Sequence, residues 1–226
     1  MRTKIYPTIT AISGNQNKKI EEAEELGISK ICVFFSPLNK SQRKNLYKEL
    51  ENSTIKEIPF AHIRGDFSKE EIYYLKEKWK TKIFNIHSAN QHPILFDYGK
   101  LKKDIYIENT MTEWQNNEII EYGGLCLDVS HLENDRLSKN KRYPYFKKIL
   151  KSTKCQCGHI SAIKDKNEYC PVAENKRYDK HVFDDFNDFN YLKRYKNILP
   201  PIMAMELENP LKEQLKAIDY IYKLLK

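Results

Sequence analysis

The sequence lacks the long apolar runs, paired cysteines and secretory leader that mark membrane and secreted proteins. No window approaches the roughly 20 consecutive apolar residues of a membrane-spanning helix. The 5 cysteines are odd in number and sparse, and residues 1–10 contain no apolar run of the signal-peptide type. These absences predict a protein of a reducing, cytoplasmic compartment, without disulfides and with no membrane partner.

Two nucleotide-binding motifs are also missing. No Gly-x-Gly-x-x-Gly follows the first strand-like run, and no P-loop occurs, so an open doubly wound sheet is disfavoured. Cys155 and Cys157 are separated by one residue, whereas a zinc knuckle has two. We therefore expect free thiols.

What the chain does have is enough apolar content for one core. At 226 residues and 40% hydrophobic composition, a single domain over 1–226 is expected. The formal net charge of +8 would attract phosphates, and nucleic acid in particular. Lysines are spread through the predicted helices instead of forming one block, which favours a solvated surface. The charge therefore leaves both small-molecule and DNA partners open, and oligomeric state is not predicted.

Strand-like runs alternate with helices along the whole chain. Eight runs have β character: 5–10, 31–35, 58–64, 82–87, 104–109, 125–127, 156–163 and 202–208. The predicted helices are 15–26, 41–51, 69–80, 94–101, 112–122, 145–151, 186–196 and 210–225, and a long polar segment, 164–184, interrupts the alternation. This pattern predicts an α/β fold, a single-domain (β/α)8 TIM barrel.

Acids and histidines lie where the strand-like runs end. The run Leu125-Cys126-Leu127 is the clearest case, because it stops at Asp128 and His131 follows three residues later. In a TIM barrel the active site is built at the carboxyl ends of the strands. The candidates, in chain order, are His62, His87, Glu108, Asp128, His131, His159, Asp179, His181, Glu206 and Glu208. Imidazoles with carboxylates suit divalent zinc, manganese, iron, magnesium or cobalt, and we expect one to three ions.

A duller interpretation exists for each candidate alone. A single His or Glu on an apolar run is often a hydrogen-bonded structural residue, and Asp179 and His181 lie in a charged loop. Burying them all at one end of a barrel would be costly without a cation, which favours the metal site. Arg64, Asn109, Lys164 and Glu206 are the predicted substrate contacts, with surface salt bridges an equal alternative for Arg64 and Lys164. Whether Glu206 or Glu208 is the eighth-strand ligand stays open, because residues two apart on a strand face the same way.

In order and placement the candidate residues resemble those of the xylose isomerase-like TIM barrel superfamily, which includes sugar and sugar-phosphate isomerases and epimerases and also endonuclease IV. The resemblance extends over essentially the whole chain and rests on His62, His87, Glu108-Asn109-Thr110, Asp128 with His131, His159-Ile160-Ser161, Asp179-Lys180-His181 and Glu208-Asn209-Pro210. By similarity to the epimerases, Glu108, Asp128, His159 and Glu208 would hold one metal and His131 would contact substrate. By similarity to endonuclease IV, His62, His87, Asp179 and His181 would add ligands for three zincs. Arg64-Gly65-Asp66 and the sequence after His181 depart from the nuclease pattern.

Three functional hypotheses follow. The first is a metal-dependent isomerase or epimerase of a sugar or sugar phosphate, with Glu108 and Glu208 exchanging the proton and His131 assisting. The alternative is an endonuclease IV-like zinc phosphodiesterase acting on abasic-site DNA. The third is a barrel that binds a ligand without turnover. Metal stoichiometry separates the first two, and the sequence alone slightly favours the isomerase.

Overall fold

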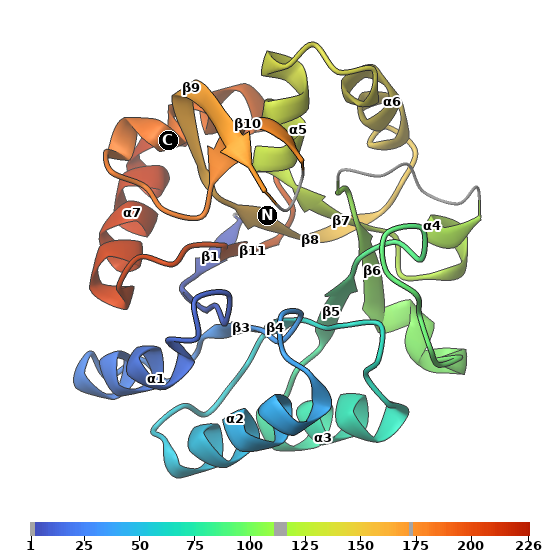
Figure 1. The fold of residues 1–226 in the computed structure, drawn as a ribbon, viewed down its shortest axis with the longest axis vertical. Coiled ribbons are helices and arrows are strands. Elements are labelled where there is room, and N and C mark those ends of the chain that lie inside the picture. The colour runs from blue at the N-terminus through green and yellow to red at the C-terminus, as the bar shows by residue number, and fades with distance from the viewer. Residues whose placement is uncertain (1–2, 111–116, 172–173) are drawn as a thin grey trace.

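The computed structural model describes residues 3–110, 117–171 and 174–226. Its main sheet is wholly parallel, in the order β1-β11-β8-β7-β6-β5-β4-β3-β2. The strands are β1 (Lys4–Tyr6), β2 (Thr8–Ile9), β3 (Cys32–Phe34), β4 (Phe60–His62), β5 (Ile83–Ile86), β6 (Ile105–Glu108), β7 (Leu125–Asp128), β8 (Cys155–Ile160) and β11 (Ile202–Met205). Viewed down the shortest axis of the molecule, the strands surround a centre and helices lie outside them (Figure 1).

The first strand-like run closes this barrel at Pro7. Proline has no backbone N–H, so it interrupts a β-ladder. Before it, β1 pairs with β11, and after it β2 pairs with β3. One extended run therefore joins the two ends of the sheet, and the predicted eight-run parallel barrel is confirmed.

Helices cover the outside of the barrel. They are α1 (Gln16–Glu25), α2 (Lys40–Asn52), α3 (Lys69–Trp79), α4 (Glu118–Glu121), α5 (Val129–Leu137), α6 (Arg142–Ile149) and α7 (Leu211–Leu224), with 3-10 segments η1 (Gly99–Asp104) and η2 (Phe186–Tyr195). The first residues of the helix expected over 112–122 lie outside the described part of the chain. In that part, no helix combines the length and apolarity that crossing a membrane requires.

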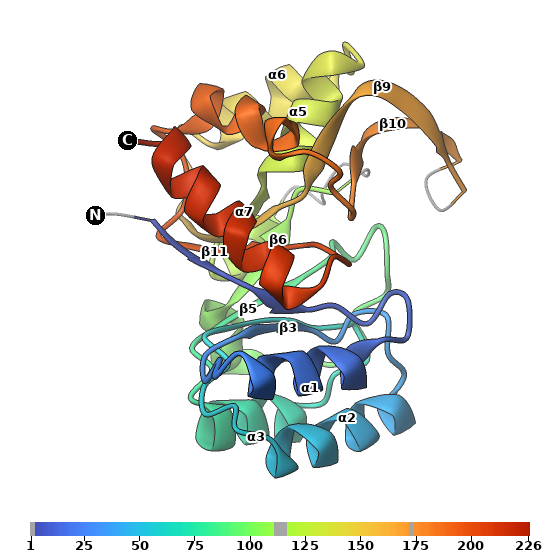
Figure 2. The same cartoon turned by 90° about the vertical axis from the view of Figure 1, so that its left-hand side faces the viewer.

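The long polar segment contains a hairpin that the sequence did not predict. Strands β9 (Ala162–Cys170) and β10 (Asn175–Lys180) pair antiparallel in a separate two-stranded sheet. Their side chains are largely polar and exposed over much of their length, so they lack the apolar alternation that reveals a strand. The hairpin projects from the barrel on the side away from the N-terminus (Figure 2).

The strands bury both faces, as parallel barrel strands do. Their outward side chains pack under the helices in the larger apolar cluster. The inward side chains form a second cluster in the barrel interior, made of Cys32, Phe34, Phe60, Tyr106, Cys126, Cys157 and Ala204. Because strand side chains alternate, the residue two positions after an inward one also points inward. That rule locates the site.

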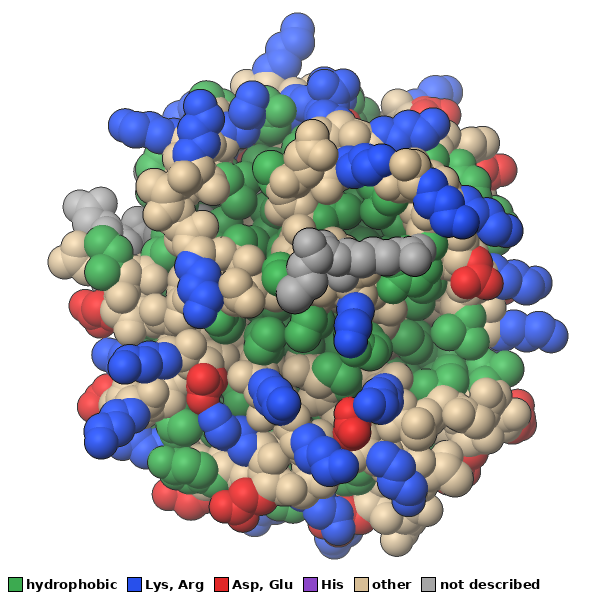
Figure 3. Space-filling view, turned by 180° about the vertical axis from the view of Figure 1, so that it is seen from behind, with side chains coloured by type: hydrophobic (Ala, Val, Ile, Leu, Met, Phe, Trp, Pro, Cys, Tyr) green, Lys and Arg blue, Asp and Glu red, His purple; other side chains and the backbone are tan. Residues whose placement is uncertain are grey.

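Lys and Arg side chains are scattered over the face of the molecule that Figure 3 shows. On the face opposite to the viewer in Figure 1, Lys and Arg side chains stand around the rim and between apolar areas and do not merge into one block (Figure 3). This distribution agrees with the solvated-surface interpretation of the net charge.

Candidate metal centre

Polar residues replace apolar ones at the last inward position of five strands. In each of these strands the polar residue lies two positions after a residue of the interior cluster. The pairs are Phe60 and His62, Tyr106 and Glu108, Cys126 and Asp128, Cys157 and His159, and Ala204 and Glu206. All five side chains are buried. The carboxyl ends of the strands therefore carry a ring of imidazoles and carboxylates above the apolar floor.

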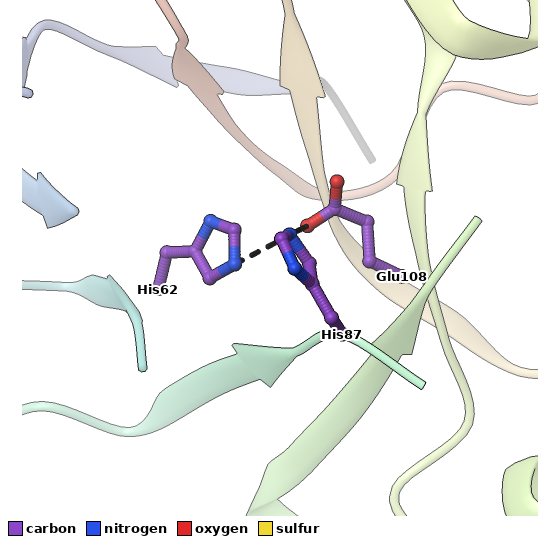
Figure 4. A group of neighbouring side chains, drawn as sticks. All are labelled: His62, His87 and Glu108. Carbon is purple, nitrogen blue, oxygen red and sulfur yellow. Dashed lines mark ion pairs between the residues drawn. The ribbon is translucent and has the colours of Figure 1, made fainter. Parts of the chain in front are cut away.

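Glu108 is the centre of a first group with two histidines. The Oε2 atom of Glu108 lies 3.6 Å from Nε2 of His62 and 3.9 Å from Nε2 of His87. Both imidazoles approach the same carboxylate (Figure 4). Asn85, two residues before His87 on the same strand run, donates its side-chain N–H to Glu108 Oε2 at 2.6 Å and so fixes that carboxylate.

Glu108 also belongs to a second group, with Asp128, His159 and Glu206. One ligand atom from each of the four lies within 4.8 Å of the others. Within the group, Nδ1 of His159 lies 3.2 Å from Glu206 Oε2 and 3.7 Å from Glu108 Oε2. The two groups share the Glu108 carboxylate, and they overlap further because His62 also forms a candidate group with His159 and Glu206.

Glu206, and not Glu208, contributes the eighth-strand carboxylate to this group. Strand β11 ends at Met205, so Glu206 is the last residue in the inward alternation. The chain then turns, and the backbone N–H of Glu208 donates to the His181 carbonyl at 2.6 Å. The Glu208 carboxylate accepts a hydrogen bond from Ser13 Oγ instead. The structure therefore places the predicted Glu208 ligand outside the candidate groups of described residues.

A third set of residues lies at the edge of the site. His131 bridges two acids, with Nδ1 at 3.6 Å from Asp128 Oδ2 and Nε2 at 3.7 Å from Asp179 Oδ2. His181 places Nε2 at 3.6 Å from Glu206 Oε1. Asp128 caps helix α5 by accepting the His131 backbone N–H, which fixes the spacing of the two side chains. The hairpin supplies Asp179, and His181 follows it directly.

Burial and like charges make the metal-free site electrostatically unfavourable. Burial raises the pKa of Glu108 well above its usual range, and the negative charges of Glu206 and Asp128 raise it further. Burial lowers the pKa of His62 well below its usual range and that of His87 to about 3. For Glu206 burial acts in the upward direction, but the histidines His181 and His159 hold its pKa well below the usual range. A divalent cation would compensate this clustered negative charge.

Unpaired buried atoms indicate that the residues fit a metal ion. Both ring nitrogens of His62, Nε2 of His159 and Oδ2 of Asp128 are buried without a hydrogen-bond partner. Such atoms cost free energy when they stay unpaired. Neutral imidazole nitrogens and carboxylate oxygens are the donors that zinc, manganese and cobalt accept.

The site opens into a cavity of about 710 Å³. Its wall includes His62, His87, Glu108, His131, Asp179, His181 and Glu206, with Arg64 and Lys180 as cationic side chains. Arg64 thus lines the cavity, and its role as a substrate contact stays a prediction. Lys164 does not: its Nζ binds Asp184 at 2.8 Å and Asp188 at 2.6 Å, and it lies outside the cavity wall. The side-chain amide of Asn109 donates to the backbone carbonyl of Asp128 and accepts from the backbone N–H of Asp128.

Three further residues were not singled out from the sequence. Asn85 shares the alternation of His87, a signal that was available. Arg177 binds Asp179 with two guanidinium nitrogens, at 2.7 and 2.9 Å, and also lines the cavity. Arg177 and Asp179 also stand two apart on strand β10, but the charged sequence of this segment predicts a loop, so the pair could not be recognised. His92 is exposed and stacks on His87 with ring centroids 5.2 Å apart.

Comparison with known proteins assigns no family to this chain. No protein-family model matches the chain, and no curated protein matches its sequence. Among solved structures, the chain is similar to a xylose isomerase-like TIM barrel protein from Mycobacterium smegmatis in complex with magnesium (13% identity, TM-score 0.45, 100% of this chain and 98% of that chain). It is also similar to the DAHP synthase of Thermotoga maritima (8%, TM-score 0.48, 98% and 68%) and an aldo-keto reductase from Bacillus halodurans (13%, TM-score 0.39, 98% and 91%).

Proposed function

We propose that this protein is a phosphodiester hydrolase that uses two or three divalent ions, as the resemblance to endonuclease IV implies. The supporting observation is that Glu108 belongs to both ligand groups, His62 with His87 and Asp128 with His159 and Glu206. A carboxylate shared between adjacent ligand groups is suited to holding two ions close together. Two-metal sites are a recurring device of phosphoryl-transfer enzymes.

The third set of residues extends the same site. His131, Asp179 and His181 line the cavity next to Glu206 and would offer ligand atoms for a third ion, although they belong to none of the candidate metal groups among the described residues. An isomerase that works with one ion does not require His62, His87, Asp179 or His181 as metal ligands. This is why the geometry favours hydrolysis over the isomerase that the sequence alone favoured.

In this proposal the bound ions supply an acidified water and neutralise charge on the phosphoryl oxygens. The protein's own residues would orient the ligand carboxylates and bind the negative charge of the substrate. Asn85 holds the shared carboxylate of Glu108 in one orientation. Arg64 and Lys180 line the cavity, where Arg64 pairs with Asp66 at 3.4 Å and Lys180 with Glu168 at 3.0 Å, and their remaining donor capacity would bind the phosphate oxygens of a substrate.

The decisive test is metal content together with hydrolysis. Protein purified without chelator is analysed for metal identity and moles per chain, and assayed on a duplex with one abasic site and on bis(p-nitrophenyl) phosphate. Two to three ions per chain and cleavage of a diester are expected. One ion and no diester cleavage would contradict the proposal.

Two matched variants locate the chemistry. Glu206→Gln should weaken metal binding by at least about 100-fold, since it removes a ligand and not merely a supporting group. Glu208→Gln changes a neighbouring carboxylate on the same segment and should leave the metal content unchanged. Metal loss in Glu208→Gln and not in Glu206→Gln would reverse the assignment.

A single-metal sugar or sugar-phosphate isomerase is the second candidate. The observation that favours it is that Glu108, Asp128, His159 and Glu206 form a complete one-ion site by themselves. The cavity is also of the size that holds a small molecule. One exchangeable ion together with turnover of a sugar phosphate would establish it.

A further inference from the structure

The barrel interior beneath the metal centre contains the thiol of Cys126, which lies close to ligand atoms of Glu108 and His159. Cys126 on β7 is the direct ladder partner of Glu108 on β6, and on its other side it pairs with Cys157 on β8. Paired residues of neighbouring parallel strands point to the same face of the sheet. The Cys126 side chain is therefore turned into the barrel beside the Glu108 carboxylate, and it is fully buried.

The distances bring this thiol within reach of an ion. Sγ of Cys126, a carboxylate oxygen of Glu108 and a ring nitrogen of His159 lie within 4.8 Å of one another. His159 is itself fully buried, and its Nε2 atom has no hydrogen-bond partner. Cys157 packs in the same interior cluster but belongs to none of the ligand groups found among the described residues.

We propose that Cys126 is a thiolate ligand of the ion held by Glu108 and His159, and that it makes this position selective for zinc-type ions over magnesium and manganese. The proposal rests on the metal centre of the proposed function. On binding, a metal–sulfur bond forms while the thiol proton leaves to solvent, and no oxidation state changes. Thiolate favours zinc and cobalt, whereas magnesium and manganese prefer oxygen ligands.

Cobalt(II) is the probe, because cobalt–thiolate bonds give an intense near-ultraviolet charge-transfer band that oxygen and nitrogen ligands do not give. The full-length protein is stripped with chelator, titrated with Co²⁺ and followed by absorption. Cys126→Ala and Cys126→Ser are compared with Cys157→Ala, the matched control from the neighbouring strand. Circular dichroism and thermal unfolding confirm that each variant is folded.

The expected result is a band that saturates with bound cobalt, persists in Cys157→Ala and a large excess of Mg²⁺, and is lost in both Cys126 variants. Zinc affinity should fall about 10- to 100-fold in Cys126→Ser. Bound cobalt without a band, or a band lost equally in Cys157→Ala, would overturn the proposal. Absence of cobalt binding would overturn it together with the metal centre. The band without diester hydrolysis would keep this ligand and remove only the proposed reaction.

Discussion

His62 has an imidazole that is 2% exposed and has no hydrogen bond to either ring nitrogen. In a metal-free protein such a side chain only costs free energy, about 1–3 kcal/mol for an unpaired buried polar group. Leucine has a similar volume and no polar atoms. We therefore expect His62→Leu to raise the free energy of unfolding in chelator by about 1 kcal/mol.

The same substitution should reduce the stabilisation that zinc provides, because ions stabilise the state that binds them. Urea unfolding with chelator and with zinc measures both effects in one protein. A variant less stable in chelator, yet equally stabilised by zinc, would show that His62 is a structural residue.

Titration of the buried acids makes the stability of the metal-free protein depend on pH. Burial raises the folded-state pKa of Glu108 and of Asp128. Burial lowers the pKa of His131, but the negative charges of Asp128, Asp179 and Glu206 together raise it above its usual value. Between the unfolded and the folded pKa of each group, the folded state binds more protons than the unfolded state. The free energy of unfolding must then fall as pH rises through that interval.

His62 and His87 act in the opposite direction, since their lowered pKa values mean that the unfolded state binds more protons below about pH 6.5. Above that pH they contribute no slope. We expect stability in chelator to decline as pH rises above about 6.5, where His62 and His87 no longer contribute, and Glu108→Gln to make the decline shallower. Urea unfolding at several pH values measures how the free energy of unfolding changes with pH. If that dependence is the same in Glu108→Gln, titration of Glu108 does not cause the decline.

Helices α2 and α3 are joined by a buried cation. The Arg43 guanidinium is fully buried and binds Glu71 at 2.8 Å and Asp66 at 2.9 Å. Glu71 also completes the capping box of α3 with Ser68. Glu71→Gln leaves Arg43 short of a counter-charge, and breaking a buried pair is strongly destabilising.

We expect this substitution to lower the free energy of unfolding by about 3 kcal/mol. Glu57→Gln is the matched control, because Glu57 pairs with Lys30 on the surface, where the Lys30 side chain is 53% exposed. An exposed pair contributes about 1 kcal/mol or less. Equal losses in the two variants, measured by urea unfolding, would show that burial of Arg43 adds nothing.

At the level of elements, the sequence predicted what alternation and capping encode. The eight strand-like runs and most helices followed from apolar periodicity, and alternation also placed His62, Glu108, Asp128 and His159 at strand ends. Hairpin β9–β10 carries little apolar signal, so it was missed together with Arg177. The choice between Glu206 and Glu208 depended on where β11 ends, which is decided by tertiary contacts of the chain after Met205.

The whole barrel is closed by contacts between its two ends. Gln214 on α7 is fully buried and accepts the Thr8 backbone N–H at 2.8 Å, across 206 positions of sequence. Its amide NH2 faces the carbonyls of Thr8, Leu207 and Asn209 at 3.0 to 3.2 Å. One side chain thus ties the first strand to the backbone that follows Glu206.

Gln214→Leu keeps the volume but leaves these backbone groups buried and unpaired. We expect a loss of about 3 kcal/mol in the free energy of unfolding, and weaker zinc binding because the segment carrying Glu206 loses its anchor. Lys216→Gln, an exposed change on the same helix, should alter neither quantity. Urea unfolding and zinc titration decide between two outcomes. A loss in both shows that closure of the barrel also holds the metal centre in place. A loss of stability alone shows that Glu206 is positioned by β11 and its neighbours without help from the closing contact.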